Sequence, residues 1–308
     1  MTSKQARSRV TELGILPIDK PGGMTSHDVV ARVRKTLGIK KVGHAGTLDP
    51  LATGVLVVCL GRATRLSDYL MGQRKRYVTR VRLGVETNTL DADGEVTARS
   101  QVLPDGIESI EAAAKQFRGT IRQVPPMYSA RKVSGKRLHE LARAGKVVER
   151  EARDVEVDSL DILDYTPPFL DLDVRCSKGT YIRSLAADLG RALRCGGSVE
   201  TLRRTEIGRI QVDQCVGLDH LTASSVSPAL LDPYEALSDL QECRLTDEEI
   251  NRFAHGNEVS VSSEPTDACR VTDEAAAFWG IGKVGPDGRL HPVCVLREQE
   301  TVRETHPA

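Results

Sequence analysis

The sequence has no apolar run long enough to cross a membrane. A transmembrane helix needs about 20 predominantly apolar residues, and no window of this 308-residue chain approaches 18 in succession. Residues 1–14 are polar and lack the apolar core of a secretory signal. We therefore expect a cytoplasmic protein that does not span a membrane.

The sequence also lacks the cysteine and histidine spacings of metal sites. Its seven cysteines lie far apart with no Cys-x-x-Cys pair, which indicates free thiols in a reducing compartment. The histidines show no metal-ligand spacing. Residues 86–94 are rich in oxygen donors, but they lack the spaced third ligand and distal glutamate of an EF-hand. We expect no metal ion.

Net charge is absent as well, since 43 Lys and Arg balance 43 Asp and Glu, but the charge is unevenly distributed. Residues 62–82 carry seven basic residues against one acidic, and residues 118–150 carry nine against two. Residues 231–308 carry sixteen acidic residues and seven basic ones. A basic body suggests a polyanionic partner, although a run of charge also suits a plain solvated face.

The most distinctive stretch is residues 43–54, which read Gly-His-Ala-Gly-Thr-Leu-Asp-Pro-Leu-Ala-Thr-Gly. Glycine and proline at this density cannot continue a helix or strand, so the stretch predicts a tight loop. An apolar run at 55–60 follows directly and predicts a buried strand. A loop fixed to such a strand would hold the polar side chains of His44, Thr47 and Asp49 accurately. Taken alone, Asp49 before a proline also suits an ordinary Asx turn.

Residues 43–56 resemble the active-site segment of the bacterial tRNA pseudouridine synthases that isomerise uridine 55 in the T-loop, the TruB type. The resemblance implies that Asp49 is the catalytic carboxylate and that His44 lies beside the substrate nucleotide. Further motifs of the family follow in the same order over residues 14–215. They are Asp-Lys-Pro-x-Gly at 19–23, Lys-Arg-Tyr at 75–77, Thr-x-Thr-x-Asp at 87–91, Ser-Lys-Gly-Thr-Tyr-Ile-Arg at 177–183 and Leu-Arg-Arg at 202–204.

These motifs imply the other site residues. Arg183 would pair with Asp49, Asp91 would orient that arginine, and Tyr77 would stack on the uracil. Substrate-binding roles fall on His44, Lys20, Tyr181 and Leu202. The sequence departs from many relatives at Asn88, where an aspartate is common, and at Ser198, where a histidine is common.

Two of these residues also have ordinary interpretations. Tyr77 lies on one face of an alternating strand, where a tyrosine usually packs against neighbours. It follows three basic residues, however, and a planar ring beside cations suits the stacking of an unpaired base. Arg183 lies off the buried stripe of a helix that follows residue 180, which by itself suits a solvated arginine.

Residues 118–150 predict a basic insertion, since the two prolines at 125 and 126 break regular structure and a polar segment follows. It resembles the RNA-gripping insertion of the family, although a surface insertion without function has the same composition. A mobile arm of this kind would contact phosphates and supply affinity. The candidate phosphate contacts are Arg131, Lys132, Lys136 and Arg137.

We predict an α+β fold with two domains. The resemblance implies a catalytic domain at 1–232, with a large mixed, mostly antiparallel sheet flanked by helices, and a small β-rich domain at 233–308 similar to PUA modules. Capping boxes predict helices starting after Thr25 and Thr246. Residues 280–285 fit Gly-x-Gly-x-x-Gly, but a turn and a strand-like run follow, so we expect a β-hairpin.

The resemblance implies that the chain isomerises uridine to pseudouridine in the T-arm of tRNA, assists tRNA folding, and acts as a monomer. This reaction gains no atom and no redox equivalent, so no cofactor is expected. Two other functions remain open from the sequence. A non-catalytic RNA-folding factor would share the basic surface, and a hydrolase would need a second carboxylic acid near the scissile bond.

Overall fold

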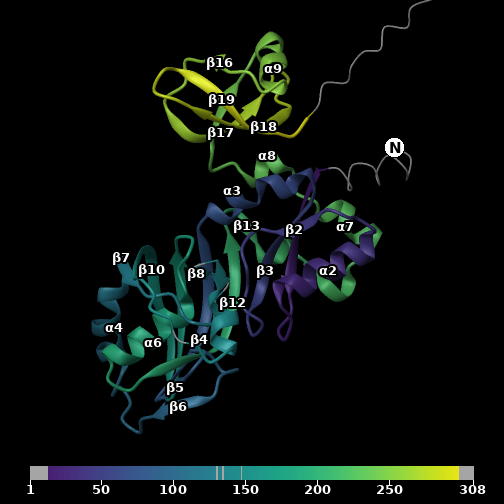
Figure 1. Cartoon of the computed structure of the whole chain (residues 1–308). Helices are drawn as coiled ribbons and strands as arrows, with labels where there is room; N and C mark the ends of the chain where they lie inside the picture. The colour runs from purple at the N-terminus through teal and green to yellow at the C-terminus, as the bar shows by residue number, and fades with distance from the viewer. Residues whose placement is uncertain (1–12, 130, 134, 147, 298–308) are drawn as a thin grey trace, which may run out of the picture.

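The computed structural model describes residues 13–129, 131–133, 135–146 and 148–297 (Figure 1). Its larger domain is built on a ten-stranded sheet with the order β14-β1-β3-β12-β4-β11-β10-β7, to which β13 and β2 add at β12 and β3. The pairs β1–β14 and β3–β12 are parallel and the other pairs in this sheet are antiparallel. This is the predicted mixed, mostly antiparallel sheet. Its strands are β1 (Leu13–Lys20), β2 (Val42–His44), β3 (Thr53–Gly61), β4 (Lys75–Leu83), β7 (Gly119–Gln123), β10 (Arg153–Thr166), β11 (Phe169–Cys176), β12 (Gly197–Ile207), β13 (Ile210–Gln211) and β14 (Val216–Gly217).

Helices lie against this sheet in two groups. Helices α2 (Ser26–Leu37) and α7 (Ala223–Ala229) lie beside the half that holds β1 to β3, and α4 (Ile107–Ala114) and α6 (Ile182–Ala192) lie beside the other half (Figure 1). The remaining described helices are α3 (Ser67–Gly72), α5 (Leu138–Arg143), α8 (Pro233–Ala236) and α9 (Asp247–Ala254). Two small hairpins form two-stranded sheets of their own. They are β5 (Val85–Thr87) with β6 (Val96–Arg99) and β8 (Lys132–Val133) with β9 (Lys136–Arg137).

Strand β3 is buried on both faces, as its apolar run predicts. Leu56, Val58 and Leu60 pack with α2 and α6 in one core. Val55, Val57 and Cys59 pack in a second core on the opposite face. The strand that follows the 43–54 loop is therefore held from both sides, and it is a firm support for that loop.

The two predicted capping boxes are confirmed. Thr25 caps α2 with a reciprocal bond to Asp28, and Gly38 ends the helix in the left-handed conformation. Thr246 caps α9 in the same way through Glu249.

The C-terminal part forms a separate five-stranded sheet, which confirms the small β-rich domain. Its order is β15-β17-β18-β19-β16. The strands are β15 (Gln241–Arg244), β16 (Val259–Ser260), β17 (Thr266–Thr272), β18 (Phe278–Val284) and β19 (Arg289–Val295). The Gly-x-Gly-x-x-Gly segment lies in β18 and its turn to β19, so it is the predicted hairpin.

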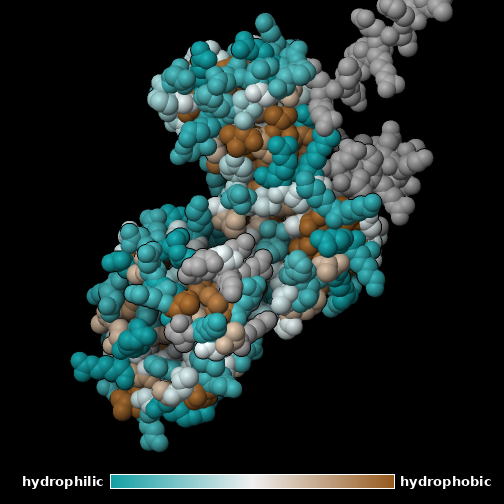
Figure 2. All heavy atoms as spheres, in the orientation of Figure 1, coloured by the Kyte–Doolittle hydropathy of each residue, from teal (hydrophilic) through white to brown (hydrophobic). Residues whose placement is uncertain are grey.

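The two domains pack against each other through apolar side chains. Phe278 and Ile281 belong to the same buried cluster as Val55 and Val57 of the larger domain. Figure 2 shows hydrophobic residues gathered on the side of the small domain that faces the larger one, while the rest of its visible surface is mostly hydrophilic. The predicted division between residues 232 and 233 falls where the Asp232 side chain caps α8, and the division itself stays a prediction.

One glycine at the start of β3 is required by close packing. Gly54 has φ +100°, and a Cβ at this position would overlap the backbone of Arg204 on the neighbouring strand. We expect Gly54→Ala to lower the free energy of unfolding by about 3 kcal/mol or more, since strained backbone and steric overlap add together. Thermal and denaturant unfolding measure this loss.

The matched control is Gly23→Ala. Gly23 also has a positive φ, +77°, but a Cβ there would meet nothing within 4 Å. We expect a loss of only about 1 kcal/mol from the left-handed conformation alone. Equal losses in the two variants would show that the contact with β12 does not constrain Gly54.

Candidate active site

The 43–54 loop is fixed by hydrogen bonds to its backbone. The amide of Ala45 donates to Val57 O at 2.8 Å, and the amide of Ala52 donates to Asp49 O at 3.1 Å to close a turn. From α2, Ser26 Oγ accepts the amide of Leu48 at 2.8 Å and donates to the carbonyl of the same residue at 3.1 Å. The backbone around Asp49 is therefore rigid without help from the Asp49 side chain.

Two buried cations hold the loop. Lys20, at the end of β1, is fully buried and donates through Nζ to Pro21 O, Met24 O and Pro50 O. Arg204, on β12, is 1% exposed. It donates to Val55 O at 2.8 Å, Gly46 O at 3.1 Å and Thr47 O at 3.4 Å. No role was assigned to Arg204 from the sequence. It lies two residues after Leu202, and this spacing places both side chains on one face of a strand, so the position of Leu202 could have indicated that of Arg204.

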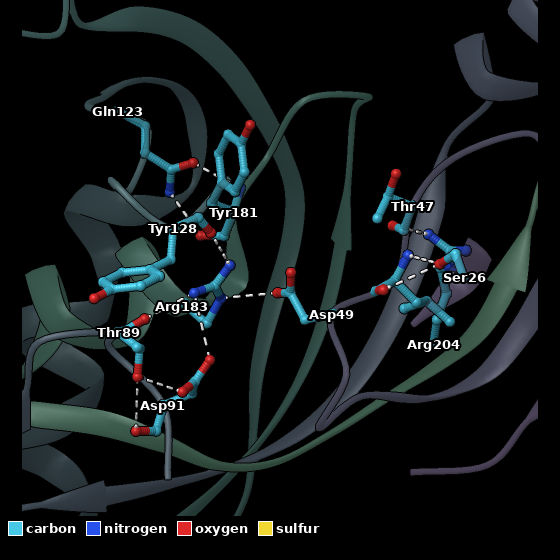
Figure 3. Close-up of polar contacts among 11 residues, drawn as sticks. Ser26, Thr47, Asp49, Thr89, Asp91, Gln123, Tyr128, Tyr181, Arg183 and Arg204 are labelled. Atoms are coloured by element: carbon cyan, nitrogen blue, oxygen red, sulfur yellow. Dashed lines mark hydrogen bonds and ion pairs between the residues drawn. The ribbon is translucent and has the colours of Figure 1, made fainter. Parts of the chain in front are cut away.

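The side chain of Asp49 meets Arg183 (Figure 3). Arg183 Nε lies 2.8 Å from Asp49 Oδ2, an ion pair whose angle falls outside hydrogen-bond geometry. Nη1 donates to Thr89 O at 2.8 Å and lies 3.4 Å from Asp91 Oδ2, and Nη2 donates to Tyr128 O at 2.8 Å. The Arg183 side chain is 4% exposed and that of Asp49 is 32% exposed. The interpretation of Arg183 as a solvated residue is therefore wrong.

Asp91 lies behind this arginine in a buried position. Its side chain is 7% exposed, and its Oδ1 accepts a bond from Thr89 Oγ1 at 2.5 Å. Burial raises the pKa of the Asp91 carboxyl, while the Thr89 bond and the Arg183 charge oppose that shift. The structure thus brings Asp49, Asp91 and Arg183 together.

A pocket of about 230 Å³ opens in front of Asp49. Tyr77, Tyr181 and Leu202 contribute to its wall together with Asp49 and Arg183, so five of the predicted site residues surround one space. Asp49 is the single carboxylate among the described residues of this wall. The others are Gly46, Thr47, Leu48, Met71, Lys75, Ser129, Ser177, Lys178, Gly179, Thr180, Ile182 and Arg204.

Two predicted substrate-binding residues lie outside that wall. Lys20 is beneath the loop, and His44 ends β2 opposite Val58 of β3. Burial lowers the pKa of His44, and the Arg204 charge adds to this effect, so its imidazole is neutral at neutral pH. Tyr77 is 8% exposed, and burial raises the pKa of its phenol.

The basic insertion was predicted at 118–150, but residues 119–123 form β7 of the main sheet, so the insertion leaves the sheet after residue 123. Between β7 and β10 it contains the β8–β9 hairpin and α5. Lys132 lies in β8, and Lys136 and Arg137 lie in β9; their side chains are outside what the structure describes. Arg131 precedes the hairpin and its side chain is partly exposed.

Over the described residues, no group of three His, Cys, Asp or Glu side chains is placed to hold a metal ion. In the same part of the chain, no helix is both long and apolar enough for a membrane span.

The fold is shared with chains of solved H/ACA ribonucleoprotein complexes. It superposes with a TM-score of 0.73 on a chain of the archaeal box H/ACA sRNP Nop10–Cbf5 complex, at 24% identity over 95% of this chain and 89% of the other. It superposes equally, with a TM-score of 0.73, on a chain of an H/ACA RNP bound to a substrate RNA containing 2′-deoxyuridine, at 22% identity over 97% and 89%. At these identities the likeness shows the fold.

The sequence comparison is more specific. Residues 34–182 match the N-terminal domain of the TruB family pseudouridylate synthases, residues 183–237 the tRNA pseudouridylate synthase B C-terminal domain, and residues 242–296 the pseudouridine synthase II TruB C-terminal domain. The chain is 44% identical to tRNA pseudouridine synthase B of Pseudomonas aeruginosa, over 94% of this chain and 98% of that protein. It is also 44% identical to the enzyme of that name from Chromobacterium violaceum, over 93% and 95%. The chain therefore belongs to the TruB family of pseudouridylate synthases.

The buried ammonium of Lys20 gives a pH signature. Burial lowers its pKa from 10.5 to about 8, although the Asp49 charge opposes the shift. Between these two values the unfolded chain binds more protons than the folded one, so this group makes stability rise with pH. We expect the unfolding free energy of the native protein, minus that of Lys20→Met, to increase from pH about 8 to about 10.

Denaturant unfolding at a series of pH values measures this difference. Lys20→Met is the appropriate variant because it keeps the length and apolar stem of the side chain while removing the ammonium. A difference that stays constant or shrinks as the pH rises would contradict a lowered pKa at Lys20.

Proposed function

We propose that this chain isomerises uridine 55 to pseudouridine in the T-loop of tRNA, as a cytoplasmic monomer that binds the T-arm and also assists tRNA folding. The observation that carries the proposal is Asp49, the single carboxylate among the described residues of the pocket wall, in contact with a buried arginine and close to aromatic side chains. The curated relatives are named for the same reaction class on tRNA.

The reaction breaks the bond between C1′ and N1 of uridine and forms one between C1′ and C5. N1 gains a proton and C5 loses one, so atoms and electrons balance without a cofactor. What the protein must supply is a carboxylate that adds to the base or the ribose and leaves again, and a pocket that holds the detached base. Asp49 suits the first role because its side chain remains 32% exposed to the pocket.

Arg183 would aim that carboxylate. Its guanidinium lies 2.8 Å from Oδ2 and attracts the carboxylate charge. The guanidinium also donates to Thr89 O and Tyr128 O and lies 3.4 Å from Asp91, and these contacts restrain its orientation toward the carboxylate. Asp91 would act through Arg183, since it does not border the pocket.

Tyr77 would serve as the platform for the uracil ring. Its ring borders the pocket, and burial raises the pKa of its phenol. A phenol that stays neutral at neutral pH suits stacking and hydrogen bonding to a base. Tyr181 and Leu202 would complete the wall around the flipped nucleotide.

The central test is Asp49→Asn. The amide has nearly the shape of the carboxylate but loses its charge and nucleophilicity, so we expect normal or slightly tighter tRNA binding and no detectable pseudouridine. The measurement is a single-turnover assay with enzyme in excess, followed by mapping of the modified position. Asp49→Ala should behave alike.

The matched control is Asp19→Asn. Asp19 is also paired with an arginine, Arg203, at 2.8 Å on the same sheet, but it does not border the pocket. We expect its single-turnover rate to stay within about threefold of native. Pseudouridine formation by Asp49→Asn at a rate near that of this control would remove Asp49 from the mechanism and leave a role in RNA folding. A product at another uridine would contradict position 55.

The basic insertion would supply affinity through phosphates. Replacing its four candidate cations together by alanine should weaken tRNA binding and flatten the dependence of log K on log salt, by about one unit of slope per lost contact. Binding titrations at several salt concentrations measure the slope. The four residues are Arg131, Lys132, Lys136 and Arg137.

The control for this set is a fourfold change in the C-terminal domain. Arg244, Lys283 and Arg289 pair there with carboxylates, and Arg252 donates to a backbone carbonyl. Their replacement by alanine should leave the slope unchanged. An equal slope change in both sets would mean that tRNA binding responds to net charge rather than to the insertion.

A further inference from the structure

Gln123 is a buried amide at the point where the basic insertion leaves the sheet. It is the last residue of β7 and is 2% exposed. Its Nε2 donates to Tyr181 O at 3.0 Å, and its Oε1 accepts the amide of Tyr181 at 2.7 Å. One side chain therefore satisfies both backbone groups of a single residue on a distant segment (Figure 3).

Tyr181 immediately precedes α6, the helix that carries Arg183. It is the N-cap residue of this helix, in an extended conformation, and its own side chain makes no capping bond. Gln123 Oε1 thus accepts the N-cap amide from a distant segment, a bond that the N3 side chain of a capping box makes locally. Fixing the peptide of Tyr181 fixes the direction in which the first turn of α6 starts.

Two further bonds join the same helical turn to the start of the insertion. Ser184 Oγ donates to Val124 O at 3.2 Å, and Arg183 Nη2 donates to Tyr128 O at 2.8 Å. The guanidinium of Arg183 therefore meets groups from three segments: the 43–54 loop, the loop at Thr89, and the start of the insertion. The planar guanidinium can contact all three segments at the same time in only one position.

We propose that Gln123 is a positioning residue for the isomerisation: it fixes the first turn of α6 against the start of the insertion and so holds Arg183 at Asp49. The inference rests on the proposed function of that ion pair. Because a misplacement of about 1 Å in a catalytic group can cost about 100-fold in rate, a shift of this turn acts on the reaction without touching the substrate.

The first variant is Gln123→Met, which keeps the size of the side chain and removes both bonds. We expect the single-turnover rate of pseudouridine formation to fall about 10- to 100-fold. The dissociation constant for tRNA should change by less than about threefold, because Gln123 is buried and presents no group to RNA.

The matched control is Thr79→Val. Thr79 is 1% exposed and donates to Thr201 O at 2.8 Å, so the variant also loses a buried bond to the backbone, but one made to β12 rather than to α6 or the insertion. We expect a lower melting temperature and a native single-turnover rate. Melting curves would check that both variants are folded at the assay temperature.

A second variant, Gln123→Glu, gives a readout that lost stability would not produce. A protonated glutamate has the shape of glutamine and can make both bonds to Tyr181, whereas the ionised form cannot donate to Tyr181 O. Burial raises the pKa of such a carboxyl. We expect its rate relative to native to recover as the pH falls from about 8 to about 6, while the ratio for Gln123→Met stays constant.

The inference is overturned by a Gln123→Met rate within about threefold of native, by equal rate losses in Thr79→Val, or by a Gln123→Glu ratio that does not depend on pH. Total pseudouridine is scored separately from its position. A native chain that modifies another uridine would contradict the proposed position, and the variant-to-native ratios at that uridine would still decide the role of Gln123.

Discussion

A charge removed from water organises this site. The Arg183 side chain is 4% exposed, and a guanidinium in such a place needs opposite charge and hydrogen-bond acceptors around it. Asp49 and Asp91 balance the charge, and the carbonyls of Thr89 and Tyr128 each accept a hydrogen bond. These partners come from segments far apart in the sequence, so the ion pair forms only when the sheet, α6 and the start of the insertion are all in place. Formation of the site is in this sense coupled to completion of the fold.

Buried cations also hold the backbone of the 43–54 loop, and their partners are carbonyl groups. Lys20 lies outside the pocket wall and Arg204 borders the pocket; both are buried and donate to backbone carbonyls on both sides of Asp49. Burial lowers the pKa of Lys20 to about 8, so keeping it charged near neutral pH opposes folding, and its hydrogen bonds to three carbonyls offset part of this cost. Lys20 and Arg204 thus fix the backbone of the loop, and the Asp49 carboxylate is left to pair with Arg183 and to face the pocket.

The sequence predicted what depends on local pattern. The capping boxes of Thr25 and Thr246, the buried strand at 55–60 and the hairpin at 280–285 follow from spacing and turn chemistry, and each is confirmed. The burial of Arg183 was not predictable from periodicity, because it lies off the aliphatic stripe of α6 and is covered by segments that are distant in sequence. The contact of Gln123 with Tyr181 was not predictable for the same reason, because the residues adjacent to Gln123 in the sequence do not distinguish it from a surface glutamine. The resemblance grouped His44 and Lys20 with the substrate-binding residues; whether they contact the substrate stays a prediction, and the structure places both outside the pocket wall.

The distribution of carboxylates also bears on the choice between isomerisation and hydrolysis. A two-carboxylate hydrolase places one acid at the leaving group and a second carboxylate at the attacking water or the sugar. Asp91 is the nearby candidate for a second acid, yet it is 7% exposed, bonded to Thr89 and Arg183, and absent from the described wall of the pocket. Among the described residues of the wall, no second carboxylate is therefore placed to activate a water molecule beside Asp49. A pocket that holds the detached base next to one carboxylate suits rejoining that base through another of its atoms.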